Sequence, residues 1–142
     1  MLYETDSFNF VQIKEYCNRV IESMLQLSDS VIIHKNIEEF TMTAKDAATI
    51  GMILIELVSN AIKYAFPDQK KGNVSVELKK ENSKMILIVK DDGVGFHKES
   101  DVMTAKTLGL KLVNLMVSQL NGQIEFDTSD GTQVTIEFPE IN

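Results

Sequence analysis

The sequence of 142 residues predicts an α+β fold: a two-layer sandwich with three helices on one face of a mixed, mainly antiparallel sheet of about five strands. Residues 73–80 alternate between apolar and polar, residues 84–90 are apolar as expected of a central strand, and the two runs are close enough to form a hairpin. A second pair of alternating strands flanks Asp130-Gly131, a strong hairpin turn signal. Hairpins imply antiparallel pairing with one buried face, and three segments with helical spacing are available to cover it.

The N-terminal part predicts a helix followed by two short strands. Apolar residues recur at helical spacing over residues 10–28, and Asn9 is the expected N-cap. The run at 30–33 is the first short strand, and residues 40–42 form the second. These elements lead into the longest helix of the chain.

That long helix is expected over residues 44–66. Thr43, with Asp46 three residues later, has the spacing of a capping box at the helix start. Pro67 ends it, because the residue before a proline is pushed out of helical geometry. Its predicted position under the strands makes one side of it core.

A polar stretch separates the central strand from the last helix. It runs from Asp91 to about Thr107, and a helix over 108–120 follows, closed by Asn121 and Gly122. Segments of that length without regular structure often bind ligands or act as lids.

Composition narrows the class of protein. The formal net charge of −7 and the absence of a long basic cluster argue against nucleic-acid binding, and anionic membranes would repel the chain. No apolar run is expected to reach transmembrane length, and the N-terminus has no signal-peptide pattern. The single cysteine, Cys17, excludes an internal disulfide. Residues 1–142 are expected to form one domain.

Three polar residues interrupt the apolar sequence "ELVSNAIKYAF" (56–66). At about 100° per residue, Glu56, Asn60 and Lys63 fall within an arc of roughly 60°, with Tyr64 at its edge. Taken alone, this stripe is best interpreted as the solvated face of an amphipathic helix.

Two downstream glycine motifs favour a ligand site instead. Asp91, Gly93 and Gly95 directly follow the central strand, where glycines permit tight turns or close approach to a ligand. Gly109 is expected at a helix start, where free N–H groups suit phosphate. The chain contains no Walker P-loop and no complete dinucleotide fingerprint.

In this order, the motifs resemble those of the Bergerat (GHKL) ATP-binding fold of gyrase, ninety-kilodalton heat-shock chaperones, mismatch-repair ATPases and sensor histidine kinases. "ELVSNAIKYAF" resembles the N box, "DDGVGF" (91–96) the G1 box, "TLGLKLV" (107–113) the G2 box, and "SDGTQVTIEF" (129–138) the closing strands. The short lid and "LKLVNLMVSQLNGQIEF" look most like the catalytic domain of one histidine-kinase subgroup.

The resemblance implies ATP and Mg²⁺ as cofactors. Asn60 would coordinate Mg²⁺ and Glu56 would hold a water in its shell or assist proton transfer, while Lys63 would lie near the phosphates. In the same way, Asp91 would accept a hydrogen bond from the adenine amino group. The further residues implied at the nucleotide are Tyr64, Gly93, Gly95, Lys106, Thr107, Leu108, Gly109 and Leu110; Thr107 stands where the G2 box often has its first glycine.

The implied function is the ATP-binding catalytic domain of a two-component sensor histidine kinase. It would transfer the γ-phosphoryl group to a histidine on a dimerisation domain of the same protein, with a response regulator downstream. His34 and His97 are expected to be surface residues rather than acceptors. The implied location is cytoplasmic, including the cytoplasmic part of a membrane-bound sensor. An anti-sigma-factor-type serine/threonine kinase or switch module of the same fold stays open, as does a regulatory domain without transfer activity.

Overall fold

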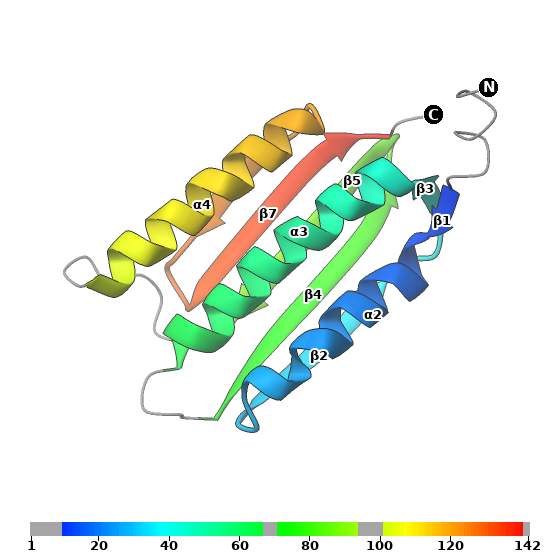
Figure 1. The fold of residues 1–142 in the computed structure, drawn as a ribbon. Coiled ribbons are helices and arrows are strands. Elements are labelled where there is room, and N and C mark those ends of the chain that lie inside the picture. The colour runs from blue at the N-terminus through cyan, green and yellow to red at the C-terminus, as the bar shows by residue number, and fades with distance from the viewer. Residues whose placement is uncertain (1–9, 67–70, 94–100, 141–142) are drawn as a thin grey trace.

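The computed structural model describes residues 10–66, 71–93 and 101–140, and for residues 101–107 it describes the backbone alone. Three helices lie side by side on one face of a twisted sheet, so the predicted two-layer α+β sandwich is confirmed (Figure 1). The elements in chain order are β1 Phe10–Gln12, α2 Ile13–Met24, the 3₁₀ turn η1 Leu25–Leu27, β2 Val31–Ile37, β3 Thr41–Thr43, α3 Ala44–Asn60, the π-helical turn η2 Ala61–Ala65, β4 Gly72–Glu81, β5 Lys84–Asp91, α4 Asp101–Gln119, β6 Gln123–Asp127 and β7 Thr132–Pro139.

The five-stranded sheet is mixed and mainly antiparallel, as predicted. Its strand order is β2-β4-β5-β7-β6, with β2 and β4 parallel and the other neighbours antiparallel. Asn82 and Ser83, which join β4 to β5, both have positive φ, as a two-residue hairpin turn requires. The apolar strand β5 is the central strand of the sheet. The residues that follow it therefore lie at the ends of the strands, in the middle of the sheet.

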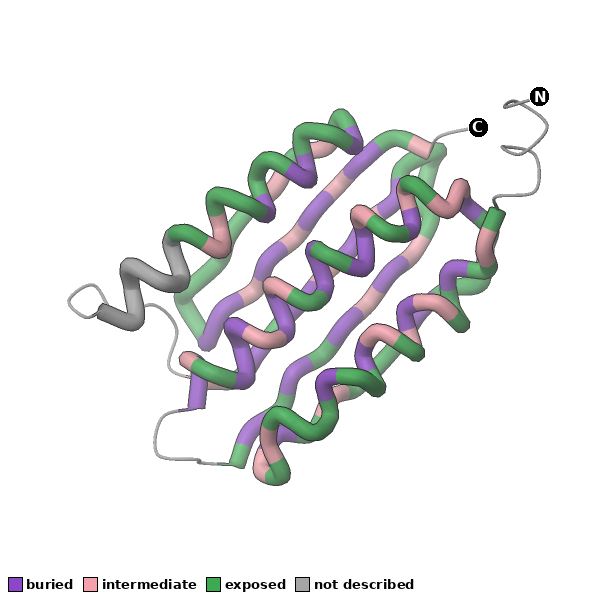
Figure 2. The backbone as a smooth tube through the Cα atoms, in the orientation of Figure 1, coloured by how far each residue is buried: buried purple, intermediate pink, exposed green. Residues whose placement is uncertain are grey.

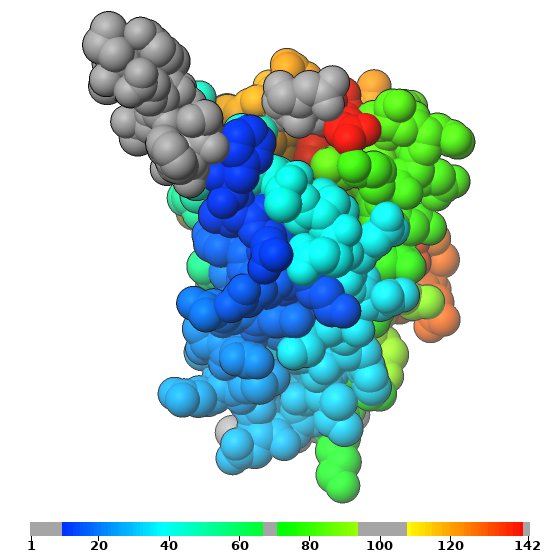
Figure 3. All heavy atoms as spheres, turned by 90° about the vertical axis from the view of Figure 1, so that its right-hand side faces the viewer, coloured from blue at the N-terminus to red at the C-terminus, as the bar shows by residue number. Residues whose placement is uncertain are grey.

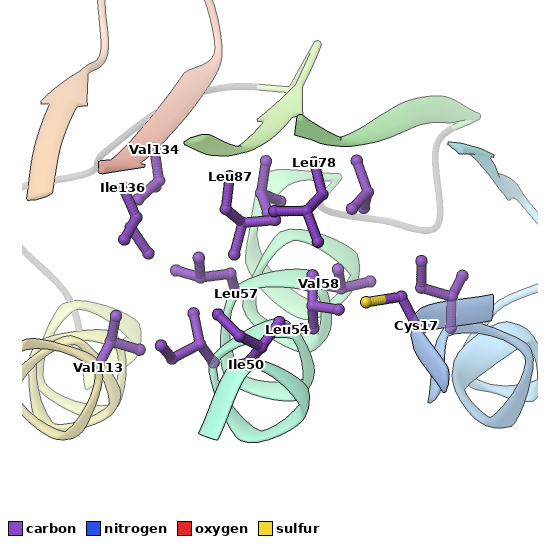
Figure 4. Packing of buried hydrophobic residues seen from close by; sticks show 14 of the residues in the cluster. Cys17, Ile50, Leu54, Leu57, Val58, Leu78, Leu87, Val113, Val134 and Ile136 are labelled. Carbon is purple, nitrogen blue, oxygen red and sulfur yellow. The ribbon is translucent and has the colours of Figure 1, made fainter. Parts of the chain in front are cut away.

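The core lies between the sheet and the helices. Val74, Val76 and Leu78 of β4 are buried while the residues between them are more exposed, so the strand alternates as its sequence predicts (Figure 2). In Figure 4, Leu78 and Leu87 from the strands point toward Leu57 and Val58 of α3. Burying each such side chain contributes about 1.5–3 kcal/mol.

Cys17 of α2 is part of this core, between α2 and α3 (Figure 4). Burial raises the pKa of the Cys17 thiol to about 12, because the thiolate would lose its hydration. The residue therefore behaves as a small apolar side chain rather than a nucleophile.

Helix α3 is the centre of the helical layer and begins as predicted. The Thr43 hydroxyl accepts a hydrogen bond from the Asp46 backbone N–H at 3.2 Å. With η2 it forms one 22-residue helix, Ala44–Ala65, which by length and composition alone could cross a membrane, contrary to the sequence expectation. Half of its most apolar stretch is buried inside the fold, however, as is usual for a core helix.

The N-terminal part differs from the prediction. Helix α2 begins at Ile13 instead of residue 10, because Phe10–Gln12 form the strand β1 and pair with β3 in a separate two-stranded ribbon. Ile13 N–H also donates to the Phe40 carbonyl at 2.9 Å, which fixes the point where strand becomes helix. The expected cap, Asn9, lies outside the described residues. Figure 3 views the molecule from the right-hand side of Figure 1. In this view α2, β2 and the β1–β3 ribbon, coloured blue and cyan, form one continuous surface.

The last helix, in contrast, begins earlier than predicted. Helix α4 starts at Asp101, whereas the sequence suggested a start near residue 108. Its C-terminus is closed by Asn121 in the left-handed region and by a hydrogen bond from Gly122 N–H to the Val117 carbonyl. The predicted stop signal is therefore confirmed, with asparagine as the left-handed residue.

Candidate functional site

Asn60 is the last residue of α3 and is buried, with 9% of its surface exposed. Among the described residues, its side-chain Nδ2 finds no hydrogen-bond partner. An unsatisfied buried amide costs about 1–3 kcal/mol, so a structural role is a poor explanation. The helix continues from Asn60 into the π-turn η2, a feature often found at functional sites.

Asp91 closes β5 at the same end of the molecule and is 5% exposed. Its Oδ1 accepts hydrogen bonds from the Gly93 N–H at 3.0 Å and from the Thr132 N–H at 3.2 Å. Asp91 and Thr132 are direct partners in the β5–β7 pairing, so the sheet itself orients the carboxylate. The Thr132 hydroxyl is buried and without a partner in the described structure.

These polar groups meet in one pocket between the helices and the sheet, near the end of β5 and the start of β7. The cavity they enclose is small in this structure, about 20 Å³, which is room for about one water molecule. Apolar side chains form most of its walls, and its polar groups come from α3, β5 and β7; the lining residues are Leu57, Asn60, Ala61, Val89, Asp91, Leu110, Phe126, Thr132 and Val134. Its walls and polar groups are of the kind that bind a flat heterocycle, with the polar edge at Asp91 and Thr132, once the cavity widens to admit one.

Glu56 of α3 and Gly109 of α4 lie against each other, next to Asn60. Glu56 is half-buried one turn before Asn60. A β-carbon at Gly109 would lie 2.7 Å from Glu56 Oε2 and 3.2 Å from Asn60 Nδ2. The absence of a side chain at position 109 therefore lets α4 pack directly on the two polar residues of α3. Motifs that are about fifty positions apart in the sequence form one cluster.

Gly93 has a different structural reason to be glycine. A β-carbon there would lie 2.2 Å from the Ala65 carbonyl oxygen, so the residue allows the chain after β5 to pack on the end of η2. Its predicted approach to a nucleotide stays a prediction. Gly95 lies outside the described residues, as do the side chains of Lys106 and Thr107.

Of the predicted site residues with described side chains, Asn60, Asp91 and Leu110 line the pocket, whereas Lys63 and Tyr64 do not, nor do Glu56, Gly93, Leu108 and Gly109. Lys63 is exposed and Tyr64 is half-buried, and both belong to η2. The π-turn has more residues per turn than an α-helix, so it rotates them out of the stripe that regular helical spacing predicts. Their roles at the phosphates and the base stay predictions.

Leu108, Gly109 and Leu110 were expected to offer free backbone amides at a helix start. Because α4 begins at Asp101, all three lie inside the helix, where the N–H groups are used in intrahelical bonds. The expectation that Gly109 lies at a helix N-terminus is therefore wrong for this structure. Leu110 still contributes its side chain to the pocket wall.

Thr132 and Phe126 line the pocket although the sequence patterns do not predict them there. Thr132 follows the Asp130-Gly131 turn, and Gly131 at φ +70° lies so close to Asp91 that a β-carbon there would be 2.1 Å from its carbonyl oxygen. The sequence signal that could have identified Thr132 was "DGT" (130–132) after a strand. Phe126 lies two residues after Ile124 on the same face of β6, and nothing in the strand pattern marks it as a ligand contact.

The donor set fits a magnesium ion held mainly by a bound phosphate. Among the described residues, no three or more histidine, cysteine or acidic side chains gather as a metal centre. Asn60 and Glu56 instead supply an amide and a carboxylate side by side, and each has an oxygen that can bind a hard cation. Mg²⁺ commonly takes only one or two protein oxygens and keeps water and phosphate as its other ligands.

The fold and this pocket are those of an ATPase domain of the Bergerat type. The chain belongs to the family of histidine kinase-, DNA gyrase B- and HSP90-like ATPases, whose model matches residues 45–142. That match includes α3, both glycine motifs and the closing hairpin.

Curated relatives are named sensor histidine kinases. The chain is 29% identical over 136 residues to the sensor histidine kinase PdtaS of Mycobacterium tuberculosis, covering 91% of this chain and 27% of that protein. It is 25% identical to the blue-light-activated histidine kinase 2 of Erythrobacter litoralis, covering 87% and 37%. The chain thus spans only about a quarter to just over a third of these relatives.

Solved structures share the fold. The histidine kinase domain of the Erythrobacter litoralis EL346 blue-light-activated kinase superposes with a TM-score of 0.82 at 22% identity, over 92% of this chain and 62% of that one. The mycobacterial sensor histidine kinase MprB gives a TM-score of 0.74 at 20% identity, over 92% and 97%.

Proposed function

We propose that this chain is the catalytic and ATP-binding domain of a sensor histidine kinase, which transfers the γ-phosphoryl group of Mg-ATP to a histidine on a dimerisation domain. The observation that carries the proposal is the pocket in which Asn60, Asp91 and Thr132 meet, within a chain that aligns along 91% of its length with a sensor histidine kinase. The short-lid subgroup stays a prediction.

In the proposed complex, the base and the phosphates of the nucleotide would contact different groups. Asp91, oriented by two backbone N–H groups, would accept a hydrogen bond from the adenine amino group, with the Thr132 hydroxyl beside it. Leu57, Val89 and Val134 would enclose the apolar faces of the base. The phosphates would then extend toward Asn60, Glu56 and the start of α4.

Phosphoryl transfer depends mainly on positioning and charge neutralisation, so no covalent nucleophile on this chain is needed. Asn60 would hold the bound cation through its amide oxygen, and Glu56 would orient a water or accept a proton at its carboxylate. Lys63, exposed at η2, would add positive charge near the phosphates. Bound Mg²⁺ would supply charge neutralisation across the phosphate oxygens.

An apolar stripe on α4 supports a partner domain near the site. Leu108, Leu112 and Leu115 recur at helical spacing with 42–64% of their surfaces exposed. Exposed leucines in one row are typical of a docking surface. The proposed occupant is the dimerisation and phosphoacceptor domain of the same protein, with a response regulator receiving the phosphoryl group afterwards; the proposed location is cytoplasmic.

The proposal is tested first by binding and then by transfer. Calorimetry should detect Mg-ATP or Mg-ADP binding to the chain at millimolar nucleotide, and no binding would overturn the proposal. With an added acceptor domain that contains a phosphoacceptor histidine, ATP should yield an acid-labile, base-stable phosphoprotein.

The chemical stability of the product separates the main alternative. An acid-stable phosphoprotein would indicate transfer to serine or threonine, as in the anti-sigma-factor-type kinases of the same fold. Nucleotide binding with no transfer to any acceptor would indicate a regulatory nucleotide-binding domain.

A further inference from the structure

We propose that Phe126 of β6, and not Tyr64 of η2, supplies the aromatic surface against which the nucleotide base packs. This inference rests on the proposed function, and it assigns a base-contacting residue to a strand outside the sequence motifs that point to the nucleotide.

Phe126 is one of the residues that line the pocket. It does so together with Asp91, Thr132 and Val134, and it is the direct cross-strand partner of Val134. Neighbouring residues on one face of paired strands lie about 4.5–5.5 Å apart at their β-carbons, so the ring stands next to the pocket wall that Val134 forms. Its strand, β6, is an edge strand of the described sheet and is paired on one side only, with β7.

The burial of Phe126 is incomplete without a ligand. Ile124, two residues earlier on the same face, packs against the core, whereas Phe126 has 40% of its surface exposed. A flat apolar ligand in the pocket would cover that exposed ring. An aromatic ring and a nucleobase also stack, which is worth about 1–3 kcal/mol per base in single-stranded nucleic-acid sites.

Tyr64 is the aromatic residue that the N-box sequence suggests for this role. In the structure it is half-buried in the π-turn η2 and does not line the pocket. The position of Phe126 follows instead from the pairing of β6 with β7, which places its ring on the same face as Val134. The aromatic contact therefore moves from the helix to the sheet.

The chain has no tryptophan, so a Phe126→Trp variant would carry a single fluorescent reporter at the proposed contact. Adding Mg-ADP should change its emission intensity or maximum in a saturable way. Phe10→Trp is the matched control, because Phe10 is 52% exposed on β1, outside the pocket, and its tryptophan should not respond. Emission from Phe126→Trp that does not change at saturating Mg-ADP would contradict the inference.

Affinity measurements test the ring itself. Phe126→Leu keeps an apolar side chain without the aromatic face, and it should weaken Mg-ADP binding by about tenfold, in line with the loss of one base-stacking contact. Phe126→Ala should weaken binding at least as much, while Tyr64→Leu should weaken it less. Thermal melts of the free variants establish that each is folded.

The outcomes separate this inference from the function on which it rests. If the unaltered chain does not bind Mg-ADP, the proposed function fails. If it binds while Phe126→Leu and Phe126→Ala bind equally well, or if Tyr64→Leu has the larger effect, only the assignment of Phe126 fails.

Discussion

Gly109 of α4 lies directly against the carboxylate of Glu56 on α3: a β-carbon at position 109 would be 2.7 Å from Glu56 Oε2. The same β-carbon would be 3.2 Å from Asn60 Nδ2. The G2 glycine therefore has a clear role in helix packing, because it leaves space for the two polar side chains that the N box supplies. A substitution at one position should consequently act through the other two.

Gly109→Ala should lower activity without lowering stability. The atom that a new methyl group meets is the tip of a flexible side chain, so the carboxylate can move at little cost. Alanine also favours a helix interior by up to about 1 kcal/mol over glycine. A displaced Glu56 should slow transfer by as much as about 100-fold, the effect of an ångström-scale misplacement. Thermal melts and transfer to an added acceptor domain measure the two quantities.

Gly51→Ala is the control for this substitution. Its β-carbon would meet the tip of another flexible side chain, the Tyr16 hydroxyl at 2.8 Å, on the α2 side of the same helix. It should leave the transfer rate close to that of the unaltered chain. Equal losses in both variants would mean that α3 as a whole shifts and that Glu56 has no special part.

Asn60→Leu should abolish Mg-nucleotide binding and leave the free protein at least as stable. Leucine has nearly the shape of asparagine but carries no amide, so the buried unpartnered Nδ2 is removed. Removing such a group avoids a desolvation cost of about 1–3 kcal/mol. Urea unfolding and calorimetry with Mg-ADP measure the two effects. Asn60→Asp, which keeps an oxygen at this position, should retain measurable binding; a strongly destabilised Asn60→Leu would indicate a structural role for the amide.

Sequence patterns predict most of the fold here because the relevant signals are local. The Thr43 cap, the alternation of β4 and the left-handed Asn121 each depend on a few neighbouring residues. The start of α2 was predicted wrongly because β1 forms only through pairing with β3, about thirty positions away.

The site was predicted less completely than the fold, because part of it depends on pairings between residues that are far apart in the sequence. Asn60, Glu56, Asp91 and Gly109 could be found because their motifs carry recognisable spacings. Thr132 reaches Asp91 through a strand pairing that spans 41 positions, and Phe126 reaches the pocket through Val134. Regular helical spacing could not anticipate the π-turn at residues 61–65, which moves Lys63 and Tyr64 away from the stripe.

Asp92 should make the fold sensitive to acid through Asn73. The side-chain amide and then the backbone N–H of Asn73 donate to its carboxylate, at 2.9 and 2.8 Å, and hold the pKa of Asp92 below its ordinary value of 3.8. A carboxyl group whose pKa is lower in the folded state stabilises the fold above its unfolded pKa. That contribution is lost as the pH falls through the folded value.

Unfolding in urea between pH 7 and pH 2.5 should therefore show a loss of stability that begins below about pH 4. Asn73→Ala removes the side-chain donor and should make this acid-dependent loss smaller. Ser129→Ala is the comparison, because Ser129 lowers the pKa of the exposed Asp127 in the same way in the β6–β7 turn. An unchanged pH profile in Asn73→Ala would show that the contact contributes nothing in solution.

Asp91→Asn should preserve the fold and weaken nucleotide binding, because the carboxylate is proposed to contact the base as well as the backbone. Its Oδ1 accepts from Gly93 and Thr132, and an amide oxygen can replace it there. At the proposed base contact an NH₂ donor would then face the adenine amino group, also a donor, so the contact would turn from attraction to repulsion. Loss of a hydrogen bond to a charged group costs about 1.5–3 kcal/mol, or roughly 10- to 150-fold in affinity.

Asp92→Asn is the matched control, because it is the same substitution one residue along, on an exposed side chain. Calorimetry should find its Mg-ADP affinity close to that of the unaltered chain. Equal losses in both variants would mean that the negative charge of this segment, and not a base contact at Asp91, supports binding.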